Sequence, residues 1–66
     1  MKLTINGEQK EFSSDLTLLE VLEVLNLTEK VMAAAVNMNI VKKDEWKSHQ
    51  LCDGDKLELL DFVGGG

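Results

Sequence analysis

Residues 17–26, TLLEVLEVLN, are the segment that most constrains the fold. At 100° per residue an α-helix gathers the apolar side chains on one face and places Glu20 and Glu23 on the opposite face. The apolar residues of that face are Leu18, Val21, Leu22 and Leu25. Thr17 and Glu20 form a capping box at the start, and Asn26 is a typical stop. The segment predicts one amphipathic helix whose apolar face must be covered.

The first thirteen residues, MKLTINGEQKEFS, have the pattern of a β-hairpin. Apolar and polar residues alternate from Met1 to Ile5, which is the period of a half-buried strand. Asn6-Gly7 is the strongest short-range signal for a hairpin turn.

Phe12 limits the length of the hairpin loop. It should share the core with Leu3 and Ile5, and cross-strand partners lie on the same face, so the loop holds an even number of residues. A two-residue loop pairs Phe12 with Met1, and a four-residue loop pairs it with Leu3. A three-residue loop would turn Phe12 to the other face.

Residues 31–41, VMAAAVNMNIV, carry mixed signals. The three alanines favour helix, whereas the valines and the isoleucine favour strand. Asn37 and Asn39 are turn residues. We therefore predict a strand at about 32–37, a turn, and a short strand around Ile40-Val41, with the small alanines allowing the helix to approach the sheet closely.

The rest of the body holds a short helical turn and the last strand. Residues 43–49, KDEWKSH, predict the helical turn, and Trp46 in it should cover one end of the small core. A turn at residues 53–55 precedes the last strand, residues 56–63.

The order of elements predicts an α+β fold. One main helix with four or five strands gives a mixed sheet with one face on the helix and one face open. A β-grasp (ubiquitin-like) arrangement, with the first and last strands adjacent and parallel, satisfies this order. We expect one domain over residues 1–63 and a flexible glycine tail over residues 64–66.

The last strand carries apolar residues on both faces. If Leu57 and Leu59 face the helix, Leu60 and Phe62 point to the open face, where exposed apolar side chains indicate a docking surface for a partner. The alternative is a bulge near residue 60 that turns Phe62 inward.

Composition excludes several classes of function. The chain has seven basic residues, all lysine, and a net charge of −5, so no basic patch for nucleic acid is expected. The negative charge suits a partner with a basic docking surface, or simply solubility. No apolar run is long enough to span a membrane, no signal peptide is expected, and the lone Cys52 fits a reducing cytoplasm.

The side chains suggest no catalytic set and no metal site. His49 lacks a nucleophile or carboxylate at a suitable spacing, and Cys52 lacks a basic neighbour that would activate it. The last strand and its turn are acidic, at Asp53, Asp55, Glu58 and Asp61. A strand divides acids between two faces, so they form either a solvated edge or a docking surface for a basic partner.

The remaining reactive group is the terminal carboxylate of Gly66. It is ionised at neutral pH and is inert as an acyl donor until it is activated, for example with ATP. Three extended residues reach about 10 Å, and Gly64 and Gly65 have no Cβ to collide with a narrow enzyme channel. The tail suits an acyl carrier; a disordered end or a cloning remnant is the alternative.

The chain resembles the ThiS family of sulfur carrier proteins over essentially its whole length. The resemblance rests on INGE at 5–8, TLLEVLEVLNL at 17–27, AAVNMNIVKKDEW at 34–46 and DGDKLELLDFVGGG at 53–66. One departure is Lys43, in the predicted helical turn, where the family often has proline.

The resemblance implies a function for the tail. A ThiF-type E1-like adenylyltransferase would adenylate Gly66 with ATP, sulfur from a persulfide would give a thiocarboxylate, and a ThiG-type thiazole synthase would accept the sulfur for thiamine. The chain itself would bind no cofactor. A MoaD-like carrier of molybdopterin synthesis and a ubiquitin-like binding module remain as alternatives. We expect a monomer or weak self-association through the open sheet face.

Overall fold

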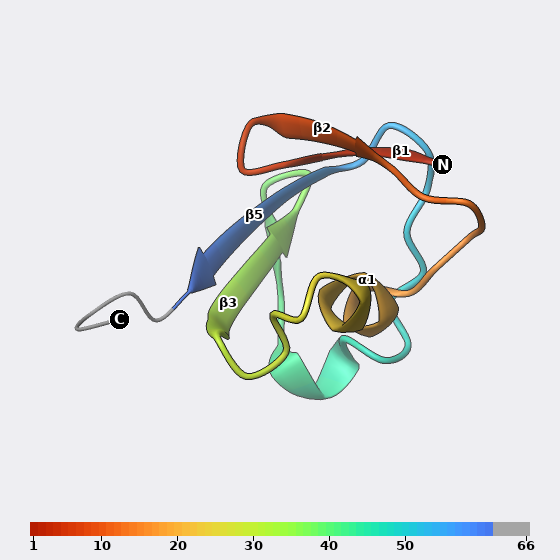
Figure 1. Ribbon diagram of the computed structural model, residues 1–66. Helices are drawn as coiled ribbons and strands as arrows, with labels where there is room; N and C mark the ends of the chain where they lie inside the picture. Colours follow the sequence, from red (N-terminus) through yellow and green to blue (C-terminus); the bar gives the residue numbers. More distant parts are fainter. Residues whose placement is uncertain (62–66) are drawn as a thin grey trace.

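The protein, seen here in a computed structural model that describes residues 1–61 and only the backbone of Asp61, has one sheet and one α-helix. In chain order the elements are β1 (Lys2–Ile5), β2 (Glu8–Glu11), α1 (Leu18–Val24), β3 (Val31–Val36), β4 (Asn39–Val41), the 3₁₀-helix η1 (Lys43–Glu45) and β5 (Lys56–Asp61). The strands form a five-stranded mixed sheet in the order β2-β1-β5-β3-β4 (Figure 1). The predicted fold class is confirmed, with β1 and β5 adjacent and parallel.

The β1–β2 hairpin has the two-residue loop that the parity of Phe12 allows. Asn6 and Gly7 both have positive φ, 50° and 86°, and Ile5 pairs with Glu8. Phe12 is buried, and its backbone N–H donates to the Met1 carbonyl at 2.8 Å. The pairing of Phe12 with Met1 is therefore the one present.

Helix α1 begins and stops at the predicted signals. Thr17 Oγ1 accepts from the Glu20 N–H at 3.2 Å, and Glu20 Oε1 accepts from the Thr17 N–H at 2.8 Å. Asn26 takes a φ of 60°, and the N–H of Leu27 bonds back into the last turn. The helix ends at Val24, two residues before the predicted end, because this Schellman-type cap takes up the next residues of the chain.

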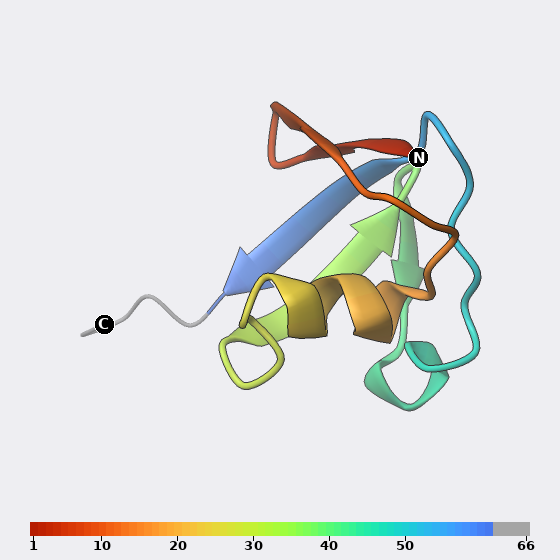
Figure 2. The same cartoon turned by 45° about the vertical axis from the view of Figure 1, so that its right-hand side comes forward.

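The core lies between α1 and one face of the sheet (Figure 2). The helix contributes its apolar stripe, with Leu18, Val21 and Leu22 fully buried. Trp46 closes one end of the core as predicted, and its Nε1 donates to the Val41 carbonyl at 3.0 Å. This bond satisfies the indole N–H in a buried place.

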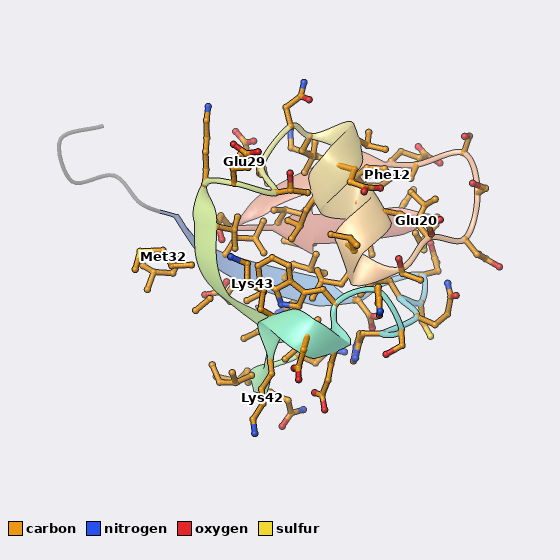
Figure 3. The ribbon with its side chains drawn as sticks, turned by 90° about the horizontal axis from the view of Figure 1, so that it is seen from below. Phe12, Glu20, Glu29, Met32, Lys42 and Lys43 are labelled. Carbon is orange, nitrogen blue, oxygen red and sulfur yellow. The ribbon has the colours of Figure 1, made fainter. Side chains whose placement is uncertain are left out.

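Strand β3 differs from the prediction because it contains a bulge. Val31 pairs with Asp61 and Ala33 with Leu60, so Met32 is an extra residue opposite the end of β5. Val31 faces the core, and Met32 lies on the side of β3 away from α1 (Figure 3). The strand predicted at about 32–37 is present one residue earlier, and the bulge reverses the alternation of its side chains at its start. The bulge lies on the neighbour of β5 and not at residue 60, and Phe62 lies outside the described residues.

The β3–β4 connection is a tight turn without glycine. Asn37 and Met38 have φ values of 50° and 72°. Asn37 therefore belongs to the turn, whereas the prediction placed it at the end of the strand. Strand β4 begins at Asn39, one residue earlier than expected, because the turn uses only two residues. The helical turn predicted at 43–49 is reduced to η1.

We predict that Met38→Gly stabilises the protein. Met38 holds a left-handed conformation that costs a side-chain-bearing residue about 1 kcal/mol, while its side chain is 92% exposed and has little packing to lose. Urea unfolding should show a gain of about 0.5–1 kcal/mol. Gly7→Ala at the other hairpin is the control, and it should lose a similar amount. A destabilised Met38→Gly would contradict the assignment of strain to this turn.

Candidate functional site

The candidate site is the end of β5, the strand that precedes the C-terminal residues. β5 lies between β1 and β3, parallel to the first and antiparallel to the second. The chain therefore reaches residue 61 from the middle of the sheet, at the end opposite the N-terminus (Figures 1 and 2). The predicted site residues Phe62, Gly64, Gly65 and Gly66 lie outside the described residues.

Two asparagine side chains hold β5 from the two hairpin turns. Asn6 Nδ2 donates to the Leu59 carbonyl at 3.1 Å, and the Leu59 N–H donates to Asn6 Oδ1 at 2.7 Å. Near the start of β5, Asn37 Oδ1 accepts from the Lys56 N–H at 3.0 Å, and its Nδ2 donates to Asp55 Oδ1 at 2.9 Å. The sequence reasoning treated both asparagines as turn residues and missed these contacts.

The side chains of β5 alternate as predicted. Leu57 and Leu59 are buried toward α1, with Leu59 only 8% exposed. Leu60 is 63% exposed and lies on the open face with Glu58. The structure thus confirms the predicted orientation of Leu60.

The open face of the sheet carries an apolar patch beside Leu60. We call Met32, Ala33, Ala35, Ile40 and Leu60 the open-face patch. A shallow groove of about 310 Å³ runs across it, lined in part by Ala33, Ala35, Ile40 and Leu60, with Asn6 and Glu58 at its polar side. Two of the three alanines face this groove, and only Ala34 packs in the core, so close approach of the helix accounts for one alanine alone.

The bulge in β3 enlarges this patch. In a regular strand Met32 would share the inward face with Ala34, but the extra residue turns it outward, where it is 60% exposed. Two neighbouring residues, Met32 and Ala33, therefore both lie beside Leu60. Single-sequence alternation cannot reveal such a shift, because it depends on the register with β5.

The acids of the turn before β5 act on the backbone. Asp53 Oδ1 accepts from the Lys2 N–H at 2.6 Å, and Asp55 Oδ2 accepts from the Cys52 N–H at 2.8 Å. The Asp53 bond joins the turn to β1, and the Asp55 bond lies within the turn itself. Among the predicted acids whose side chains the structure describes, Glu58 borders the groove.

The structure also places the other residues that the sequence analysis considered, His49, Cys52 and Lys43. His49 accepts the Leu18 N–H on its backbone carbonyl at 2.9 Å, and Cys52 is an exposed free thiol. The Lys43 ammonium lies 5.8 Å from the centre of the Trp46 ring (Figure 3 labels Lys43). The turn η1 thus forms with lysine at the position that departs from the family pattern.

Within residues 1–61, no three His, Cys, Asp or Glu side chains gather where they could hold a metal ion. None of the helices in that range is long and apolar enough to cross a membrane.

We predict that the same substitution lowers the free energy of unfolding strongly at one leucine of β5 and hardly at all at its neighbour. Leu59→Ser leaves a cavity and a polar group in the core, which should cost about 2–5 kcal/mol. Leu60→Ser alters an exposed side chain and should change the free energy of unfolding by about 0.5 kcal/mol or less. Urea titration of both variants checks this. Equal losses would mean that Leu60 belongs to the core and not to the open face.

The comparisons with known proteins agree on one family. The model of the ThiS family matches residues 3–66. The sulfur carrier protein ThiS of Escherichia coli is 30% identical over 66 residues and covers the whole of both chains. The sulfur carrier protein ThiS of Bacillus subtilis is 32% identical over 65 residues, covering 97% of this chain and 98% of its own.

A longer relative and a solved structure complete the comparison. The thiazole synthase of Paramagnetospirillum magneticum is 41% identical to this chain over 66 residues, and the chain spans only 20% of that protein's length. The crystal structure of the thiamine biosynthesis protein (ThiS) from Geobacter metallireducens has 30% identity and a TM-score of 0.82, with both chains covered completely. Its fold is therefore that of this chain. Sequence, length and fold agree, and the chain belongs to the ThiS family.

Proposed function

We propose that this chain is a sulfur carrier protein of thiamine biosynthesis and that the carboxylate of Gly66 carries the sulfur. The observation that carries the proposal is the family match through residue 66, together with full-length relatives that are sulfur carrier proteins. These relatives and the Geobacter structure favour the thiamine pathway over a MoaD-like role.

The chemistry acts on the end of the main chain. A Gly66 carboxylate oxygen attacks the α-phosphorus of ATP on an activating enzyme, and pyrophosphate leaves. The terminal sulfur of a persulfide then attacks the acyl carbon and AMP leaves, which gives an acyl disulfide. A thiol attacks the donor's sulfur of that disulfide, forms a new disulfide with the donor and releases the thiocarboxylate on Gly66. ATP and its metal ion belong to the activating enzyme, a ThiF-type E1-like adenylyltransferase, and this chain supplies the acyl group.

Three features of the chain suit this chemistry. β5 is paired with β1 as far as Leu57 and with β3 as far as Asp61, so the C-terminal segment begins from a strand that is built into the sheet. Gly64 and Gly65 present no side chain to a narrow active-site channel. The open-face patch, which includes Leu60, offers apolar area on which an enzyme can dock close to the end of β5.

A thiazole synthase is the acceptor that the comparisons support. The Paramagnetospirillum thiazole synthase includes a segment similar to this chain, so a carrier-like segment and a synthase share one polypeptide in that protein. We therefore propose a ThiG-type synthase as the partner that takes the sulfur. A cytoplasmic location fits the single free thiol of Cys52.

We predict that activation and sulfur transfer change the mass of the protein at one residue. Incubation with ATP, a cognate ThiF-type enzyme, a persulfide donor and a thiol should add the difference between one sulfur and one oxygen atom, as read by intact mass spectrometry. Deleting Gly66, or adding one residue after it, should abolish the gain because the reactive carboxylate is misplaced. A gain that survives both changes, or no gain with an active enzyme, would contradict the proposal.

We predict that Leu60→Ser weakens docking of the activating enzyme. Truncating a central apolar contact costs an interface about 1.4 kcal/mol or more, so the KM of the adenylation reaction for this chain should rise about tenfold. Val24→Ser is the matched control, because Val24 is equally exposed at 61% but lies on α1, away from the open face. Equal effects of the two changes would show that the open-face patch is not the docking surface.

A further inference from the structure

Asn6 connects the first hairpin turn to the end of β5. Its φ of 50° turns the backbone away from β5 after Ile5, the last residue of β1. Its side-chain amide nevertheless makes the two bonds with the Leu59 backbone described above, at 3.1 and 2.7 Å.

The two bonds continue the parallel ladder between β1 and β5. In a parallel pair, a residue donates its N–H to one residue of the neighbouring strand and accepts from the residue two positions further on. The Asn6 N–H follows this pattern and donates to the Leu57 carbonyl at 2.9 Å. The Leu59 N–H should then meet the Asn6 carbonyl, but it meets the side-chain Oδ1 instead.

The amide nitrogen supplies the next group of the same ladder. The Leu59 carbonyl would accept from the residue two positions after Asn6 in a longer β1, and Asn6 Nδ2 takes the place of that N–H. The side chain of Asn6 thus supplies the acceptor and the donor that two backbone groups would supply if β1 continued beside β5. The contact extends the pairing of β5 on its β1 edge from Leu57 to Leu59.

This extension matters because Leu59 lies at the base of the C-terminal segment. Leu60 of the open-face patch is the next residue, and the segment that ends in Gly66 begins directly after Asp61. On its other edge β5 pairs with β3 as far as Asp61, across the bulge at Met32. Bonds on both edges restrict the twist of the strand end, whereas a strand held only along a bulged edge can bend.

We propose that Asn6 is a positioning residue: its amide fixes the direction in which the chain leaves β5 and thereby the rate at which the Gly66 carboxylate reaches the activating site. This inference rests on the proposed function. The effect is one of direction, because a change in the length of a flexible segment alters the local concentration of its end only slowly. Misplacement of a reacting group by about 1 Å can lower a rate by up to about a hundredfold.

Asn37 provides the matched control for a purely structural role. It also occupies the first position of a hairpin turn with φ of 50°, and its side chain also bonds the β5 backbone. Its contact is at Lys56, the opposite end of the strand from residues 62–66. Glycine at either position keeps the positive φ and removes the side-chain bonds.

The experiment compares Asn6→Gly and Asn37→Gly in the full chain. Adenylation by a cognate ThiF-type enzyme is followed by pyrophosphate release, with the chain as the varied substrate and at a temperature where both variants are folded. For Asn6→Gly the kcat should fall about tenfold while the KM changes by less than about twofold, since the apolar side chains of the open-face patch are unchanged. Asn37→Gly should keep the wild-type kcat. A wild-type kcat for Asn6→Gly, or an equal fall for both variants, would overturn the proposal.

Two further measurements separate the proposal from loss of stability. Asn6→Asp keeps the acceptor for the Leu59 N–H and loses the donor, so its kcat should lie between wild type and Asn6→Gly. Hydrogen exchange at the Leu59 amide should rise about tenfold in Asn6→Gly relative to amides of α1, and should stay unchanged in Asn37→Gly. Unchanged exchange in Asn6→Gly would overturn the claim that Asn6 fixes the end of β5. A wild-type chain that takes no adenylate would contradict the proposed function, and the exchange result would still decide the role of Asn6.

Discussion

The pairing of β5 between β1 and β3 is the interaction on which the rest of the structure depends. It joins the first hairpin to the second, buries Leu57 and Leu59 against α1, and brings the last residues out of the middle of the sheet. A chain that ended on an edge strand would begin its tail from a segment held on one side only. Here the base of the tail belongs to a strand that is held by β1 and Asn6 as far as Leu59 and by β3 as far as Asp61.

The two faces of the sheet have different tasks. One face is closed by α1, with Trp46 covering one end, and supplies the stability that a 66-residue chain needs. The other face carries the open-face patch, where the bulge at Met32 and the outward side of β5 place apolar side chains beside the start of the C-terminal segment. Separating the core from the proposed docking face would let surface changes alter partner affinity at little cost in folding.

Local signals were enough to predict much of the fold. The capping box at Thr17, the Asn6-Gly7 turn and the alternation of Leu57, Leu59 and Leu60 each depend on residues close in sequence, and each is present. The bulge at Met32 and the side-chain bonds of Asn6 depend on register between strands far apart in sequence, so no local pattern predicts them. That the carried group is sulfur was inferred from the family resemblance, because the residues alone indicate only that the terminal carboxylate is the available reactive group.

The proposed mechanism requires that the body presents Gly66 and that sulfur on Gly66 is sufficient for transfer. The most direct test supplies the chain already bearing a C-terminal thiocarboxylate, prepared by cleaving an intein fusion with sulfide, to a ThiG-type thiazole synthase with its other substrates. The mechanism predicts thiazole formation without ATP or the activating enzyme, limited to one product per chain, and none from the ordinary carboxylate form. A continued requirement for ATP and the activating enzyme, or product from the carboxylate form, would contradict it.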